Sequence, residues 1–92
     1  MTKTSKEKIL IVDDDQSVIS TLSLLLKKNN YLPIAAYTPE QALQFMIEHE
    51  PALIIHDMNY SRQTSGAEGM ELLANIRKVD ADIPVILITA WG

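Results

Sequence analysis

The stretch "ILIVDDDQSV", residues Ile9 to Val18, joins an aliphatic run to three consecutive carboxylates and then to polar residues that suit a helix. Aliphatic runs without polar alternation are typical of strands that are buried on both faces of a parallel sheet. Carboxylates about 4 Å apart repel each other by about 4 kcal/mol at the effective dielectric of a protein surface. The stretch therefore predicts a buried strand whose end needs a cation nearby.

The rest of the chain repeats this alternation of strand and helix. Helices are predicted after Asp15, after Thr38 and from about Met70 to Arg77. Strands are predicted at residues 8–12, 31–37, 52–56 and 83–89. Because the connections have helical length, the strands should be parallel and covered by helices on both faces, which is an α/β fold.

Two prolines fix local details of this arrangement. Pro33 removes one ladder hydrogen bond from the second strand and so places that strand at a sheet edge. Pro39 suits the first position of a helix for which Thr38 is the N-cap and Gln41 closes a capping box. Both features predict where the second strand and the second helix lie.

Length and composition indicate a single globular domain. The chain has 92 residues, of which 47% are hydrophobic and 22% charged. Residues 1–7 are predicted to form a polar tail. Residues 58–68, "MNYSRQTSGAE", form a predicted loop that is longer than ordinary strand-to-helix connections, and such loops are often functional.

Several function classes are disfavoured by the same numbers. A net charge of −4 with only 8 Lys and Arg residues argues against direct nucleic-acid binding. The absence of cysteine excludes disulfides, thiolate zinc sites and thiol nucleophiles, and is compatible with a cytoplasmic location, which we expect. No apolar run approaches the roughly 18 residues needed to cross a bilayer, so no membrane partner is expected.

Three of the predicted strands end at a residue with a reactive oxygen. Asp13 and Asp14 follow the first strand, Asp57 follows the third, and Thr89 ends the fourth. In a parallel sheet with the strand order 2-1-3-4, ligands bind at the carboxyl ends of strands 1 and 3. Carboxylates gathered there suit a hard cation with oxygen ligands, namely Mg²⁺. An Asp beside such a cation is suited to accept a phosphoryl group.

Four segments together resemble the response regulator receiver domain of two-component signalling. They are "ILIVDDDQSV", "LIIHDMN", "GMELLANIR" and "IPVILITA". The resemblance covers nearly the whole chain. It implies a flavodoxin-like parallel sheet in the order 2-1-3-4 and a phosphoacceptor module that takes its phosphoryl group from a sensor histidine kinase.

The resemblance also implies a role for each acidic residue at the strand ends. Asp57 would be the phosphoacceptor and a ligand of Mg²⁺. Asp14 would bind the same ion directly, and Asp13 would bind it through water. Asn59, two residues after Asp57, would contribute its backbone carbonyl. These four residues form the predicted metal site.

The predicted switch follows the fourth strand. By the same resemblance, Thr89 would turn toward the phosphoryl group, and the small side chain of Ala90 would leave room for it. The change would be passed to an output domain outside this chain, for which a transcription activator is one candidate. The output domain, the kinase and the signal cannot be identified from these residues.

The chain departs from the family pattern after the fourth strand. The family continues with a fourth helix, a fifth strand bearing a lysine that contacts the phosphoryl group, and a fifth helix. None of the six lysines of this chain lies after Lys78, so no catalytic lysine is expected here. We therefore interpret residues 1–92 as a partial receiver domain, and expect it to self-associate through the open edge of its fourth strand.

Two other functions stay open at this point. A receiver-like interaction module that is never phosphorylated would have the same fold. A haloacid dehalogenase-type phosphatase would use Asp13 as nucleophile and Asp15 as acid and base, with a threonine at a strand end. The chain lacks the glycine-rich turn of that phosphatase family after Asp15, and Asp57 would have no task in it. We therefore expect a signalling domain rather than an enzyme.

Overall fold

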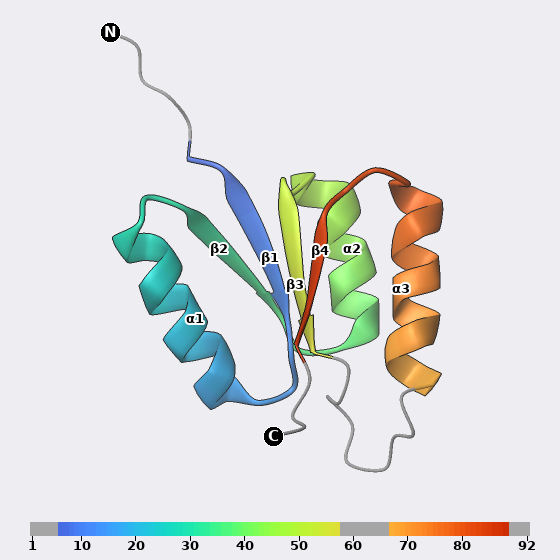
Figure 1. Cartoon of the computed structure of the whole chain (residues 1–92), viewed down its shortest axis with the longest axis horizontal. Coiled ribbons are helices and arrows are strands. Elements are labelled where there is room, and N and C mark those ends of the chain that lie inside the picture. Colours follow the sequence, from blue (N-terminus) through green and yellow to red (C-terminus); the bar gives the residue numbers. More distant parts are fainter. Residues whose placement is uncertain (1–5, 58–66, 89–92) are drawn as a thin grey trace, which may run out of the picture.

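Four parallel strands alternate with three helices in a computed structural model of the chain (Figure 1), which describes residues 6–57 and 67–88, except for the side chains of residues 57 and 67–70. In chain order the elements are β1 (Lys8–Val12), α1 (Gln16–Lys28), β2 (Leu32–Ala36), α2 (Pro39–His49), β3 (Leu53–Asp57), α3 (Ala67–Val79) and β4 (Val85–Ile88). The sheet order is β2-β1-β3-β4, and all neighbours pair in parallel. The predicted fold class and strand order are confirmed.

Strand alternation divides the core between the two faces of the sheet. Residues of β1, β2, β3, α2 and α3, together with Ile83 from the connection between α3 and β4, form the main cluster: Leu10, Val12, Ala36, Ala42, Met46, Ile54, Leu72, Ile76 and Ile83. The intervening residues Ile9 and Ile11 are also buried, on the face that α1 covers (Figure 1). β1 is therefore buried on both faces, as its unbroken aliphatic run predicted.

The first two helices begin at the predicted caps. The carboxylate of Asp15 accepts the N–H of Ser17 at 2.9 Å, and Thr38 Oγ1 accepts the N–H of Gln41 at 3.1 Å. Gln41 Oε1 accepts the N–H of Tyr37, one residue before the cap, rather than that of Thr38 itself. The helix starts are thus fixed locally by side chains that replace missing backbone partners.

The two edge strands differ in exposure. β2 lies at one edge, as Pro33 predicted. At the other edge, Ile86 is 50% exposed and Leu87 is 44% exposed. Because consecutive strand residues point to opposite faces, β4 presents apolar surface on both of its faces. β4 therefore differs from the central strand β1, whose aliphatic side chains are buried on both faces.

One predicted boundary was wrong. Residues 67 and 68, which the sequence placed in the long loop, belong to α3. Ala67 and Glu68 are favourable helix residues, and Gly69 costs only about 1 kcal/mol within a helix, so it does not set the start. The remainder of that loop, residues 58–66, and residues 1–5 of the predicted tail lie outside the described residues. Across the described ranges, every helix is too short or too polar to cross a membrane.

Candidate functional site

The candidate site lies at the carboxyl edge of the sheet, where the four strands end at Val12, Ala36, Asp57 and Ile88. β1 and β3 pair in a register that sets Val12 against His56. Asp13 and Asp57 each follow by one residue, so their backbones come to neighbouring positions at this edge. Parallel pairing therefore joins two acids that are 44 positions apart in the sequence.

Asp13 is held firmly at this edge. It is 3% exposed, and its N–H donates to the carbonyl of Ala36 at 3.1 Å, which extends the β1–β2 ladder by one residue. Its Oδ1 accepts the N–H of Asp15 at 2.9 Å. The buried carboxylate is thus fixed by the turn that leads from β1 into α1, because it forms part of that turn.

The three consecutive acids have different surroundings. Asp13 is buried, whereas Asp14 and Asp15 are exposed. The carboxylate of Asp15 caps α1 through Ser17. Asp14 makes no hydrogen bond or ion pair among the described residues. Of the three, Asp14 is therefore the exposed acid whose carboxylate bonds to none of the described residues.

The neighbouring histidine belongs to the core. His56 is 0% exposed and lies in β3 directly before Asp57, paired in register with Val12 on one side and Leu87 on the other. Its full burial places this side chain in the interior of the domain. The expectation that this histidine packs in the interior is confirmed.

The donor chemistry at this edge fits a hard divalent cation. Mg²⁺ prefers carboxylate and carbonyl oxygens and keeps several waters, which suits an exposed carboxylate at Asp14 beside a buried one at Asp13. Within the described side chains, no three His, Asp or Glu residues form a ligand group. The side chain of Asp57 and all of Asn59 lie outside that description. The oxygen donors that are described are of the right kind.

The predicted switch residues follow the other neighbour of Asp57. β3 and β4 pair so that Asp57 lies opposite Ile88, the last residue of β4. Thr89 and Ala90 come next in the sequence and lie outside the described residues. The register therefore brings the end of β4, which leads into these residues, to the backbone of Asp57.

Comparison with known families agrees with the fold described above. Residues 9–92 match the response regulator receiver domain. The chain belongs to this family. Receiver domains are signalling modules of two-component systems, and the family match replaces the phosphatase interpretation of Asp13 and Asp15 with a receiver fold.

Individual relatives and solved structures agree with the family. Sporulation initiation phosphotransferase F of Bacillus subtilis is 35% identical over 86 residues, covering 94% of this receiver chain and 66% of the relative. Transcriptional regulatory protein GlrR of Escherichia coli is 32% identical over 84 residues, covering 91% and 18%. The structure of Vibrio cholerae chemotaxis protein CheY4 superposes with a TM-score of 0.83 at 25% identity, covering 95% and 71%. The chain thus spans 66% of the phosphotransferase and 18% of GlrR.

One structural role in the site was missed by the sequence analysis. Asp13 was assigned only a water-mediated contact with the metal, yet its carboxylate accepts the N–H of Asp15. A signal for this bond was present, because Asp side chains commonly bond the backbone two residues further on. The acids of "DDD" therefore stabilise the turn between β1 and α1 in addition to providing negative charge.

Proposed function

We propose that this receiver domain accepts a phosphoryl group on Asp57. The observation that carries the proposal is the β1–β3 register, which sets the backbones of Asp13 and Asp57 side by side at the carboxyl edge. Membership of the receiver family supports the same assignment. The donor would be the phosphohistidine of a sensor histidine kinase.

The transfer itself is a displacement at phosphorus. A carboxylate oxygen of Asp57 attacks, the phosphorus–oxygen bond forms, and the phosphorus–nitrogen bond of the phosphohistidine breaks. The released imidazole then takes up a proton. The product is an acyl phosphate on Asp57, which stores the signal until water removes the phosphate.

In this proposal, oxygen ligands at the carboxyl edge hold Mg²⁺. Asp14 and Asp57 would bind it through their carboxylates, Asn59 through its backbone carbonyl, and Asp13 through water. The bound ion would neutralise charge on the transferred group. The exposure of Asp14 and the fixed, buried carboxylate of Asp13 support this division of roles.

We assign the response to phosphorylation to the residues after β4. The hydroxyl of Thr89 would donate to the new phosphoryl group, and the small Ala90 would make room for that movement. The pairing of Ile88 with Asp57 supports the assignment, because Thr89 is the next residue in the chain. Phosphorylation would then bias two arrangements of this segment.

The signal would pass to an output domain outside this chain. Two of the relatives are named as transcriptional regulators, and the match covers 33% and 18% of their lengths. Those proteins thus contain much more than the matched region. We propose transcription control as the output of the whole protein, and the cytoplasm, where histidine kinases phosphorylate their partners, as its location.

We further propose that the chain self-associates through the open edge of β4. Ile86 and Leu87 are exposed on opposite faces of this strand, and exposed apolar edge strands favour pairing with another chain. Sedimentation at increasing concentration should reveal a dimer that Ile86→Lys weakens. Leu25→Lys changes an α1 leucine that is 54% exposed, close to the 50% of Ile86, and serves as the control. A monomer at all concentrations would contradict the proposal.

The phosphoacceptor proposal is tested with a small phosphodonor. Acetyl phosphate and Mg²⁺ are added to the protein, and phosphate is detected by intact mass. We expect one phosphate on the wild type and on Asp15→Asn, and none on Asp57→Asn. Loss of phosphate in Asp13→Asn but not in Asp57→Asn would favour the phosphatase chemistry. No phosphate on any form would favour an interaction module.

A further inference from the structure

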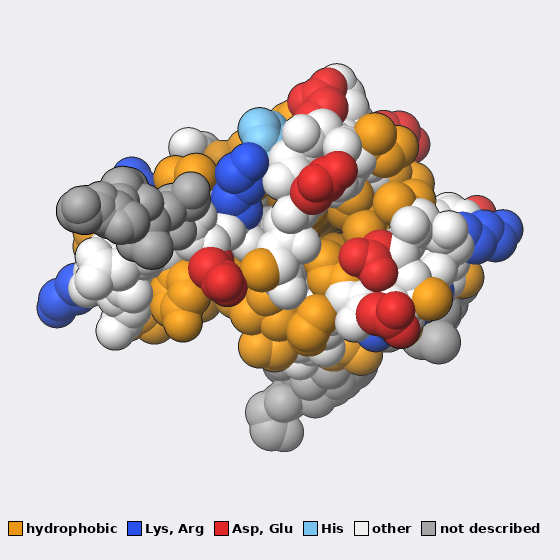
Figure 2. All heavy atoms as spheres, turned by 90° about the horizontal axis from the view of Figure 1, so that it is seen from above, with side chains coloured by type: hydrophobic (Ala, Val, Ile, Leu, Met, Phe, Trp, Pro, Cys, Tyr) orange, Lys and Arg blue, Asp and Glu red, His pale blue; other side chains and the backbone are white. Residues whose placement is uncertain are grey.

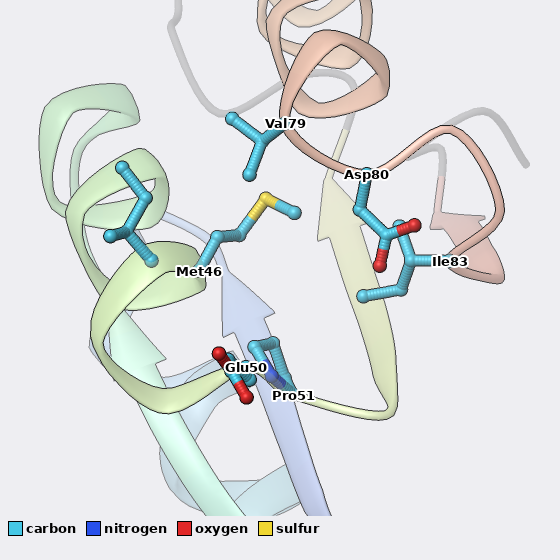
Figure 3. A pocket seen from close by; sticks show the side chains of 7 residues that line it. Met46, Glu50, Pro51, Val79, Asp80 and Ile83 are labelled. Atoms are coloured by element: carbon cyan, nitrogen blue, oxygen red, sulfur yellow. The ribbon is translucent and has the colours of Figure 1, made fainter.

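At the opposite end of the sheet, which we call the amino edge, α2 and α3 end on either side of a hollow (Figure 3). Its volume is about 420 Å³, within the usual range of about 300–1,000 Å³ for ligand pockets. Met46 and Ile83, each 4% exposed, belong to the core beneath it. Ile47 and Val79, which are 66% and 46% exposed, leave apolar surface open to solvent beside them.

Two carboxylates flank this hollow from different helices. Glu50 is the C-cap of α2, and Asp80 directly follows α3 (Figure 3). Figure 2 looks onto this edge and shows acidic side chains on both sides of an apolar depression. The C-terminal end of a helix carries partial negative charge and is stabilised by cations, so carboxylates are unfavourable there. Both acids therefore stand where a positive charge would be favourable.

In the described part of the chain neither acid forms an ion pair, although Lys6, Lys8 and His49 line a second hollow together with Glu50. Asp80 accepts the backbone N–H of Asp82 at 2.9 Å, and Glu50 has no side-chain partner there. Lys8 Nζ donates to the carbonyl of His49 at 3.4 Å instead. Arg77 donates to backbone carbonyls of the loop before β4. Lys8 and Arg77 are thus engaged with the backbone, and neither forms an ion pair with the two carboxylates beside the hollow.

We propose that this hollow docks a segment of a partner protein that carries one apolar side chain between Lys or Arg residues. The apolar side chain would enter the hollow, and the flanking cations would pair with Glu50 and Asp80. The net charge of −4 attracts a basic partner at long range. Because this surface is at the opposite edge from Asp13 and Asp57, the inference goes beyond the proposed phosphoacceptor function.

The test uses the ¹⁵N-labelled chain and the capped peptide Lys-Lys-Leu-Lys-Lys as probe. We expect amide shifts centred on residues 46–51 and 79–83, with binding that weakens as salt is added. A peptide with Ser in place of Leu tests the apolar contribution and should bind more weakly. A peptide with Glu in place of each Lys tests the charge and should not bind.

Matched variants separate this surface from general attraction between charges. Glu50→Gly removes one carboxylate at a residue with φ 50°, where Gly is favourable, and Asp80→Asn keeps the acceptor for Asp82. The double variant should bind about 2- to 30-fold more weakly, as two surface ion pairs allow. Glu40→Gln with Glu71→Gln removes the same charge elsewhere and should bind like the wild type.

Three results would overturn the inference. The first is a set of shifts centred on residues 13–16, which would place the peptide at the other edge. The second is equal weakening by both double variants, which would indicate unspecific attraction to an acidic protein. The third is shifts at the hollow that depend on protein concentration without peptide, which would make a second copy the occupant.

Discussion

The two edges of the sheet contain similar side chains in opposite electrostatic settings. In a parallel α/β fold, helices begin at the carboxyl edge and end at the amino edge. At the carboxyl edge, Asp15 and Thr38 accept hydrogen bonds from helix N-termini. At the amino edge, Lys8 and Arg77 donate to backbone carbonyls. Acids are therefore favourable at the first edge and unfavourable at the second.

Because of this difference, acids at the carboxyl edge and acids at the amino edge are interpreted differently. The chain direction alone favours acids at the carboxyl edge, and in the proposed function a bound metal ion accounts for their number and burial. Glu50 and Asp80 at the amino edge gain nothing from the helices that precede them. Their presence beside apolar surface is the stronger indication of a partner, because the fold does not require it.

The largest effect is expected from the core beneath the amino edge. Met46 is 4% exposed, and Met46→Ala should lower the free energy of unfolding by about 2–5 kcal/mol, because it leaves a cavity. Ile47→Ala, one residue further on and 66% exposed, should change it by about 0.5 kcal/mol or less. Urea unfolding followed by circular dichroism measures both. Equal losses of unfolding free energy would show that Met46 and Ile47 do not differ in burial as the structure has them.

A smaller effect is expected at the carboxyl edge. Asp14→Asn removes a proposed ligand charge and should weaken Mg²⁺ binding at least about tenfold, or about 1.4 kcal/mol. Asp15→Asn removes the same charge one residue away but retains a side chain that caps α1, so its affinity should change little. Isothermal titration with Mg²⁺ distinguishes them. If both variants weaken binding alike, the ion responds to total charge and Asp14 is no ligand.

An effect of similar or smaller size is expected at the turn between β1 and α1. Asp13→Ala removes the acceptor for the Asp15 N–H and should cost about 1–2 kcal/mol of stability. Asp13→Asn keeps an acceptor oxygen and removes one of the clustered charges, so without Mg²⁺ it should be at least as stable as the wild type. Urea midpoints of the two variants provide the comparison. An Asn variant as unstable as the Ala variant would mean that the negative charge itself holds this turn.

Most of the fold could be predicted from the sequence because local signals agree with the global arrangement. The aliphatic run of β1 predicted a central strand, Pro33 predicted an edge, and Asp15 and Thr38 predicted the starts of their helices. Each of these signals acts over a few residues. Chain direction then determined which ends of the strands would meet.

The missed Asp13–Asp15 bond is local, but the missed hollow depends on contacts between distant segments. The hollow at the amino edge forms only when the ends of α2 and α3 come together, and no local pattern marks that meeting. The left-handed conformation of Glu50 is unusual for a residue other than glycine, and no sequence pattern predicted it. At the carboxyl edge, by contrast, the three consecutive acids could be recognised in the sequence.

The central claim is that acids from β1 and β3 bind one divalent ion at the carboxyl edge. The most direct test is a crystal of the chain soaked with Mn²⁺, with the ion located by its anomalous scattering. We predict one strong peak bound by oxygens of Asp14 and Asp57, with Asp13 linked through water. A well-ordered crystal with no peak at this edge, or with the ion bound at Glu50 and Asp80 instead, would contradict the account.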